Sequence, residues 1–289
     1  RIASQYTNLT KLMNRFEGDE IVSSVAKLIK GFRLGMWEKS HHLDKMDFRG
    51  LVKAYFQYYA IQGYLILAAI SIGVAIAYPP TTLEILAATG VAVVFYPLVW
   101  YVLHRFVLHG QWMFKSRLTA RTWKRIHFDH HQDPNHLEVL FGALYTTLPA
   151  IAAAMLPIGY LIGGVGGMAV AMAAGLLTTC FYEFVHCIQH LAYKPKYEFL
   201  KKMKARHMAH HFHDETGNFG ITDFTWDRLF GTFYERAQRP QKSPSVFNLG
   251  YDEEAAKLYP WVAAKSGGTF KTPQRRAKVK EELERQQAA

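Results

Sequence analysis

Charged side chains are missing from three long stretches of this 289-residue chain, although they make up 20% of the whole. None occurs in the 30 residues from Ala54 to Leu83, the 19 from Ile85 to Leu103, or the 44 from Val139 to Tyr182. A membrane-spanning helix needs about 20 apolar residues. Half of the chain is hydrophobic, which excludes a disordered chain or a coiled coil. We therefore expect a multipass membrane protein.

Cysteine is also scarce, and several common motifs are absent. The two cysteines, Cys180 and Cys187, lie in or beside the last apolar stretch and form no CxxC motif. We expect neither a disulfide framework nor a thiolate metal site. The first 50 residues lack the short apolar stretch of a signal peptide. No GxGxxG or P-loop motif predicts a nucleotide site.

The basic residues predict the topology. Gly163–Gly167 interrupts the third stretch, which we divide into 140–162 and 168–182, so that four spans result. All 34 Lys and Arg residues fall in 1–53, 104–138 and 184–289, and the two intervening turns contain none. The positive-inside rule then places both termini and the middle loop in the cytoplasm, with a bacterial inner membrane or the endoplasmic reticulum as the membrane. The net charge of +11 indicates contact with anionic lipid headgroups and no binding of nucleic acid.

The expected fold is all-α: an integral membrane domain of about four transmembrane helices, with a cytoplasmic helical cap. Residues 10–38 mix apolar and charged side chains at helical spacing, which is typical both of an interfacial amphipathic helix and of an ordinary surface helix. We expect residues 1–53 to form a cytoplasmic or interfacial N-terminal segment, 54–239 the membrane domain, and 240–289 a cytoplasmic tail. Pro149 and Pro157 predict a kinked helix or one that does not fully cross the membrane.

Histidine is abundant, and ten of the 14 histidines fall into four groups at the cytoplasmic ends of the predicted spans or just outside them. The groups are HxxxxH at His104 and His109, HxxHH at His127, His130 and His131, HxxxH at His186 and His190, and a second HxxHH at His207, His210 and His211. A single histidine on a helix is more often a satisfied polar group than a ligand, and we interpret His41, His42, His136 and His213 in that way, with His213 the best candidate among them for a supporting role. Ionisable groups at membrane ends are costly and usually functional, so the four groups indicate a site.

The spacing of the grouped histidines predicts metal ligands. Residues three or four apart share a helix face, so HxxxH can hold one ion, as can the outer histidines of each HxxHH motif, while the middle one points away. This doubled pattern suits two neighbouring ions. The HxxxxH rings stand about 140° apart on an ideal helix, so that pair requires a helix end or a π-bulge. Imidazole suits iron, copper, zinc and nickel, and the pattern predicts an all-histidine, or nearly all-histidine, dimetal centre.

From about Val91 to Tyr234, the chain resembles the fatty-acid hydroxylase and sterol desaturase superfamily of integral-membrane oxygenases. The resemblance rests on the four histidine motifs and on the segments 217–222 and 225–232. The order HxxxxH, HxxHH, HxxxH, HxxHH is most similar to fatty-acid 2-hydroxylases. The resemblance implies two ions, one held by His104, His109, His127, His131 and His210, and the other by His130, His186, His190, His207 and His211.

Several other residues are candidates for supporting roles. Carboxylates often orient metal-binding imidazoles, and the candidates here are Asp129, Glu183, Asp214 and Asp227. Asp129 and Asp214 are more simply surface or capping residues. Lys194, Lys196 and Arg206 lie close in sequence to the motifs and are candidates for binding an anionic headgroup, although they also fit a purely topological role.

The resemblance implies an O2-dependent, non-haem diiron hydroxylase that acts at carbon 2 of a fatty acyl chain or an acyl-containing lipid. Zinc can replace iron in imidazole sites of purified samples. No catalytic residue is predicted beyond the metal ligands. Many eukaryotic fatty-acid 2-hydroxylases carry a fused cytochrome b5 domain with an HPGG haem motif, and residues 1–53 contain neither. We therefore expect electrons from a separate protein, such as cytochrome b5 or ferredoxin.

Two alternatives stay open. A sterol or carotenoid oxygenase or desaturase of the same superfamily would use the same metals. A transition-metal transporter would hold ions in transit, but transporters usually place ionisable ligands near the midplane of broken helices. The middles of the predicted spans lack His, Asp and Glu, so transport is the weaker alternative. Two tightly held ions with O2 consumption would distinguish the enzyme from the transporter.

Overall fold

The computed structural model describes residues 41–268 of the chain. Within this range the structure is helices joined by loops, and the only β-type pairing is an isolated bridge between His42 and His136. The all-α prediction is confirmed for these residues. The predicted amphipathic segment at 10–38 and the end of the predicted tail, 269–289, lie outside the described residues.

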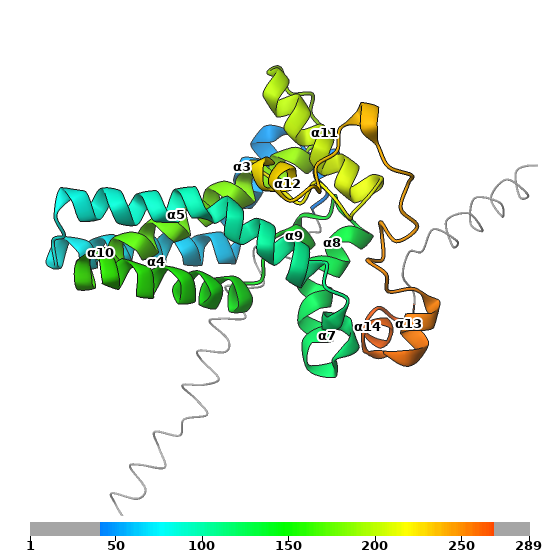
Figure 1. The fold of residues 1–289 in the computed structure, drawn as a ribbon, viewed down its shortest axis with the longest axis horizontal. Helices are drawn as coiled ribbons and strands as arrows, with labels where there is room; N and C mark the ends of the chain where they lie inside the picture. Colours follow the sequence, from blue (N-terminus) through cyan, green and yellow to red (C-terminus); the bar gives the residue numbers. More distant parts are fainter. Residues whose placement is uncertain (1–40, 269–289) are drawn as a thin grey trace, which may run out of the picture. The chain divides into compact units, whose positions relative to one another are not determined.

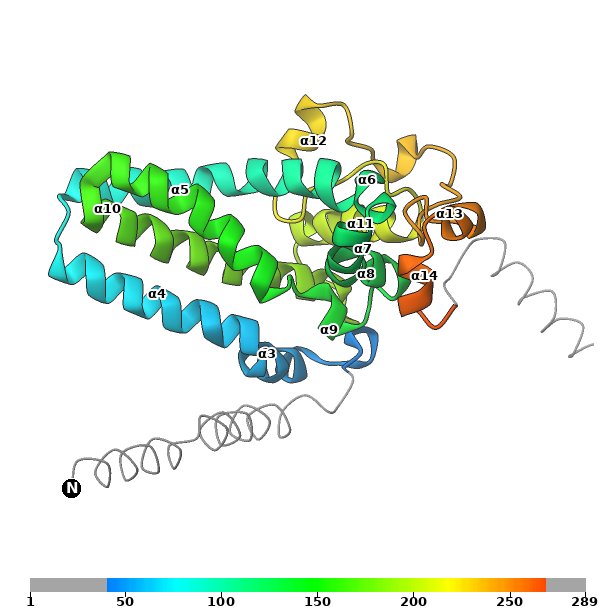
Figure 2. The same ribbon diagram turned by 90° about the horizontal axis from the view of Figure 1, so that it is seen from below.

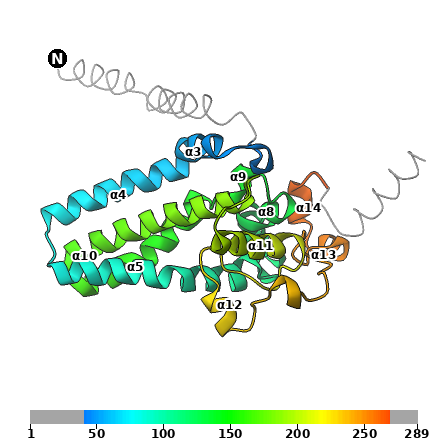
Figure 3. The ribbon, with the colours of Figure 1, turned by 90° about the horizontal axis from the view of Figure 1, so that it is seen from above.

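Three helical regions are long and apolar enough to cross a membrane. They contain α4 (Tyr59–Ala77), α5 (Thr82–Val102) and α10 (Leu144–His190). The backbone of α10 is not helical at Gly163 and Gly164, and the chain reverses its direction there (Figure 2). The two halves of α10 pack beside α4 and α5, so four apolar segments lie side by side (Figures 2 and 3). This arrangement agrees with the expected number of about four.

Glycine permits the reversal in α10. Gly164 has a φ of +58°, a left-handed conformation that costs glycine little. Close to the turn, a Cβ atom on Gly159 would stand 2.6 Å from the carbonyl oxygen of Gly167 and 2.7 Å from Cβ of Ala171. Small residues allow membrane helices to approach this closely. The reversal therefore lies at the glycine pair, and the helix continues through Pro149 and Pro157.

The turn between α4 and α5 lies beside the turn in α10. Thr81 and Glu84 form a capping box at the start of α5, in which the N–H of Thr81 donates to Oε2 of Glu84 over 2.7 Å. The side chain of Glu84 also borders Gly163, and a Cβ atom on Gly166 would meet the carbonyl oxygen of Tyr78. The one acidic residue between the first two apolar stretches thus serves as a helix cap.

Short helices gather at the opposite end of the bundle, where the histidine motifs lie (Figure 1). They are η1 (Leu43–Lys45), α3 (Phe48–Gln57), η2 (Leu103–Leu108), α6 (Trp112–Lys115), α7 (Arg117–Trp123), η3 (Lys124–Phe128), α8 (Asp129–Gln132), α9 (Leu137–Leu140), α11 (Glu198–Phe212), α12 (Thr225–Leu229), η4 (Arg236–Gln238), α13 (Glu253–Leu258) and α14 (Trp261–Lys265). Part of the predicted tail belongs to this cap, because Leu249, Tyr251 and Val262 pack in one buried cluster with Phe114 and Trp123.

Candidate metal centre

The ten grouped histidines form two clusters at the end of the bundle. The first cluster is His104, His109, His127, His131 and His210, and the second is His130, His186, His190, His207 and His211. Within each cluster, one ring nitrogen from every residue lies within 4.8 Å of the others, so each cluster could hold a metal ion. The rings of His131 and His211 bring the clusters into contact, with their centroids 4.4 Å apart. This grouping is the one that the family resemblance implies.

The helix geometry sorts the histidines of each HxxHH motif. His127 and His131 enter the first cluster while His130 between them enters the second. In α11 the sorting is reversed, because His207 and His211 belong to the second cluster and His210 to the first. Outer residues four positions apart share a helix face and the middle one points elsewhere. Two such motifs can therefore serve two neighbouring ions.

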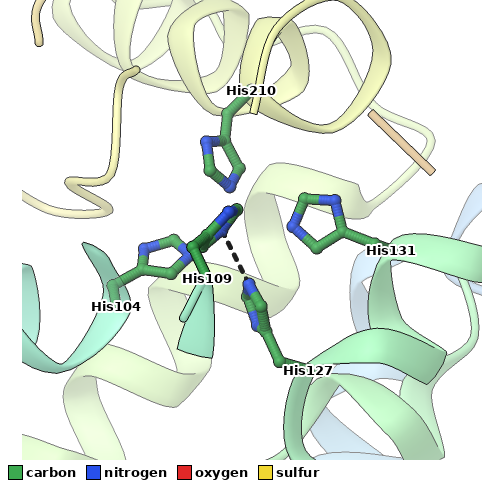
Figure 4. Close-up of side chains that lie close together, drawn as sticks. All are labelled: His104, His109, His127, His131 and His210. Atoms are coloured by element: carbon green, nitrogen blue, oxygen red, sulfur yellow. Dashed lines mark hydrogen bonds between the residues drawn. The ribbon is translucent and has the colours of Figure 1, made fainter. Parts of the chain in front are cut away.

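A π-helix brings the HxxxxH pair together. Over η2 (Leu103–Leu108), the backbone N–H of His109 donates to the carbonyl oxygen of His104 over 3.0 Å, a bond spanning five residues. The wider turn places the two ring centroids 4.9 Å apart, and both rings point into the first cluster (Figure 4). The prediction that this spacing needs a helix end or a π-bulge is confirmed.

Backbone carbonyls orient three rings of the first cluster. The Nδ1 atoms of His104, His131 and His210 lie 2.6, 2.9 and 2.8 Å from the carbonyl oxygens of Phe219, Val246 and Gly217. Because a carbonyl only accepts, each Nδ1 must carry the proton, which leaves a lone pair on Nε2. These three Nε2 atoms are buried and have no hydrogen-bond partner. Buried polar atoms are normally paired, so the three lone pairs fit a metal ion.

In the second cluster, ring nitrogens face one another directly. Nε2 of His190 lies 2.9 Å from Nε2 of His207, and Nε2 of His130 lies 3.1 Å from Nε2 of His211. Two imidazoles bound to one ion at about 2.1 Å and at right angles would place their nitrogens about 3 Å apart. The observed spacing fits ligands that share an ion.

Burial keeps the histidines neutral. It is the largest cause that lowers the pKa of each ring outside the spans, and it holds the pKa of His210 at about 4. For the other rings, burial and the neighbouring imidazoles together hold the pKa well below its ordinary value. These rings are His109, His127, His130, His131, His207 and His211. A neutral imidazole offers its lone pair to a metal without first losing a proton. No carboxylate belongs to either cluster among the described residues.

We expect the metal-free protein to lose stability in acid. Between pH 6.5 and about 4, His210 is protonated in the unfolded chain but stays neutral in the folded protein. The free energy of unfolding therefore falls as the pH falls through this window. The loss is on the order of 3 kcal/mol for His210 alone. Thermal unfolding in detergent across this range measures the effect. An unfolding midpoint that does not change with pH would contradict the buried neutral histidines.

Of the candidate carboxylates, Asp227 supports the site through the backbone. It is fully buried, and its carboxylate accepts from the N–H groups of Phe219 and Gly220, each over 2.8 Å. These bonds hold the loop whose carbonyls orient His104 and His210. Asp227 therefore positions two rings indirectly.

The other three carboxylates have partners outside the histidine clusters. Glu183 accepts from the N–H of Gly142 over 3.0 Å. Asp129 pairs with Lys124 over 2.6 Å, and Asp214 accepts from the N–H of Thr216 over 3.0 Å. Asp214 is buried and Asp129 half-buried, so neither is a plain surface residue, and the partners named here tie each to its own segment of the chain.

The remaining histidines and basic candidates lie outside the clusters. His41 and His136 contact Glu138 at 2.7 and 2.8 Å, and the ring of His42 stacks on that of His136. Nε2 of His213 lies 2.8 Å from the carbonyl oxygen of Pro240, a contact that involves no histidine of the clusters. Lys194 and Lys196 are exposed. Arg206 pairs with Glu235 over 2.6 Å and lies over the ring of Phe233, which makes it a poorer candidate for a headgroup.

Two features of this region were not predicted from the sequence. One is the set of backbone carbonyls that orient the rings. The other is Lys204, which donates to the carbonyl oxygen of Leu191 at the end of α10. Every residue carries a carbonyl, so no residue type announces this role. The loop at Gly217 did carry a sequence signal, because Gly217 and Asn218 are residue types that favour turns. A Cβ atom there would stand 2.5 Å from the carbonyl oxygen of Thr232, and Asn218 has a φ of 56°.

A cavity of about 440 Å³ runs from the histidines into the apolar bundle. This volume is within the range of small-molecule sites. Its histidine end includes His104 and His127 of the first cluster and His130 of the second, and its wall is mainly apolar. Gly175 and His186 both line the cavity and lie 11 residues apart on α10, which is about 16 Å along a helix. Its length and apolar wall suit a hydrocarbon chain.

Comparison with known proteins identifies relatives. The family model described as fatty acid hydroxylase matches residues 89–232. The ceramide very long chain fatty acid hydroxylase SCS7 of Saccharomyces cerevisiae is 30% identical over 150 residues, which cover 50% of this chain and 37% of that protein. The dihydroceramide fatty acyl 2-hydroxylase FAH1 of Arabidopsis thaliana is 34% identical over 138 residues, which cover 46% and 54%. The fatty acid 2-hydroxylase of Mus musculus is 28% identical over 154 residues, which cover 51% and 39%.

A solved structure has the same fold. It is described as full-length scs7p with only the hydroxylase domain visible; the TM-score is 0.55 and the identity 25%, over 68% of this chain and 73% of that one. The apolar bundle, the histidine clusters and these likenesses define a membrane-embedded domain of the histidine-rich hydroxylase class. The chain belongs to the fatty acid hydroxylase family. It spans less than two thirds of the length of the curated relatives named above.

Proposed function

We propose that this protein hydroxylates a fatty acyl chain, free or within a lipid, at the carbon next to the carbonyl. The observation that carries the proposal is the apolar cavity that ends at both histidine clusters. An acyl tail would lie in the bundle, with its carbonyl end near the surface and carbon 2 beside the histidines. The names of the curated relatives, which are ceramide or fatty acid hydroxylases, support this choice of substrate.

We propose that each cluster holds one iron ion through all five of its histidines. The ions would supply the activation of O2 that no amino-acid side chain provides. The chain itself orients the ligands, because the carbonyls of Gly217, Phe219 and Val246 fix three rings through Nδ1. Burial also excludes water from the reacting carbon.

The overall reaction requires an external reductant. A C–H bond breaks and a C–O bond forms at carbon 2, one atom of O2 enters the product, and the other leaves as water. Two electrons and two protons complete the balance. We propose that a separate electron-transfer protein, such as cytochrome b5 or ferredoxin, delivers the electrons at the histidine end of the bundle.

Mass spectrometry of a reconstituted reaction tests this function. Protein supplied with iron, a reductant and isotopically labelled O2 should add one labelled oxygen atom at carbon 2 of the acyl chain. A new double bond without label, or label only on a sterol or carotenoid, would place the protein in another branch of the superfamily. Uptake of metal into vesicles without any oxygenated product would favour a transporter.

We also propose that the histidine end of the bundle faces the cytoplasm, because the basic residues gather there. Reporter tags at Gly164 and after Ala289 should then lie on opposite faces, with the second in the cytoplasm. Protease protection in sealed vesicles gives the answer. Two tags on the same face would contradict the topology.

A further inference from the structure

Helices α6 and α7 carry an exposed surface that is both apolar and basic. We define the α6–α7 surface as Trp112, Lys115, Arg117, Leu118 and Arg121, all of which are exposed. Leu118 is 90% exposed and Trp112 54%, which are high values for large apolar side chains. Isolated exposed leucines are ordinary, but here the leucine and the tryptophan stand among three cations.

The opposite face of α7 is covered. Ala120 and Trp123 are buried in a cluster with Val262 of α14. Figure 1 shows α7 running sideways from the histidine end of the bundle, with α13 and α14 on the side away from the bundle. Leu118 and Arg121 lie on the face of α7 that is opposite the buried one. This face therefore points toward the level at which the apolar bundle ends. That level is the membrane surface if the apolar bundle spans the bilayer.

The charge of this region is of one sign. Between Glu84 and Asp129, the sequence has six basic residues and no acidic one. Lys124 pairs with Asp129, and Arg125 donates to the hydroxyl of Tyr58. The three basic residues of the α6–α7 surface, by contrast, have no ion-pair partner among the described residues. They are available to anions from outside the protein.

We propose that the α6–α7 surface inserts into the headgroup layer of the membrane and binds anionic phospholipids there. Exposed tryptophan and leucine side chains, here on the neighbouring short helices α6 and α7, with arginine and lysine around them, are typical of segments that lie in a membrane interface. Basic residues next to a membrane segment are attracted to anionic lipids, and α6 follows directly on η2, the continuation of α5. The inference does not depend on the proposed hydroxylation.

The same two helices also line the cavity. Met113 of α6 and Thr122 of α7 contribute to its wall. A lipid held at the α6–α7 surface would therefore lie next to the cavity wall. The anchor thus places the cavity beside the pool of membrane lipid from which an acyl chain would enter.

Fluorescence quenching by lipids tests the anchor. A Leu118→Cys variant would carry an environment-sensitive fluorophore, since the native cysteines are buried. The full-length protein would be placed in nanodiscs of phosphatidylcholine, with or without phosphatidylglycerol, containing lipids brominated near the headgroup. Leu258→Cys is the matched control, because Leu258 is a leucine of the same cap, 71% exposed, on the α13 side. We expect several-fold stronger quenching at position 118 than at position 258.

A charge variant tests the choice of lipid. Replacing Lys115, Arg117 and Arg121 by glutamine in the labelled Leu118→Cys protein should lower the quenching in phosphatidylglycerol to the value in pure phosphatidylcholine. Equal quenching at positions 118 and 258 would overturn the proposal. So would a probe at 118 shielded from both lipid and water, because another part of the chain or a second copy would then cover the surface. If the triple variant does not fold, the comparison of the two labelled positions still decides.

Discussion

Replacing His131 or His211 by alanine should lower hydroxylation by more than about 100-fold, the upper end of the losses seen when only a hydrogen-bond partner of a metal ligand is removed. Each residue belongs to a different cluster, and their rings meet at the contact between the clusters. Both side chains are completely buried, so no solvent-exposed group can replace the lost nitrogen. Product formation and iron content per chain are the measurements.

The control for this prediction is His42→Ala. His42 stacks on His136 and belongs to neither cluster, so its replacement should leave turnover and iron content close to those of the native protein. Both cluster variants should still be recovered from the membrane fraction, because the apolar segments are unchanged. Native turnover in the two cluster variants, or an equal loss with His42→Ala, would contradict the assignment of the ligands.

Replacing Ala154 by phenylalanine should strongly reduce the hydroxylation of long acyl chains while shorter ones are still accepted. Ala154 lines the cavity two helical turns beyond Thr147, close to Met155 and Gly175. A larger side chain there would fill the end of the cavity, and interiors are too closely packed to absorb that volume. The ratio of products from a mixture of chain lengths measures the effect.

Ala153→Phe is the matched control for the cavity. Ala153 precedes Ala154 on the same helix, is exposed, and does not line the cavity. Its replacement adds the same volume on a different face, so the preferred chain length should not change. An equal shift with both variants would mean that the bundle is disturbed as a whole. An unchanged product ratio with Ala154→Phe would show that the acyl tail lies elsewhere.

The sequence was most informative where a single residue type carries the signal. Uncharged stretches revealed the apolar segments, and the glycines after Ile162 revealed the reversal in α10. The spacing of His104 and His109 even predicted a departure from α-helical geometry, because two rings five residues apart cannot converge on an ideal helix. In each case local geometry alone decides the outcome.

Contacts between distant segments could not be foreseen in this way. His131 is held by the carbonyl of Val246, and Asp227 acts on His104 only through the loop at Phe219. We expected residues 240–289 to form a tail, yet Tyr251 and Val262 lie in the buried core of the cap. The region contains many apolar residues, but no local pattern indicates that they pack on Phe114 and Trp123, which lie more than 120 residues earlier in the chain.

The bond between His131 and Val246 joins residues 115 positions apart, and this separation bears on how the protein is made. A ribosome adds about 5–20 residues per second, so all four apolar segments can enter the membrane before α11 and Val246 leave the ribosome. The apolar part of the cavity wall can thus form first, while the histidine centre still lacks the three histidines of α11 and all three orienting carbonyls, those of Gly217, Phe219 and Val246. The order of synthesis therefore completes both histidine clusters only after the four apolar segments have been made.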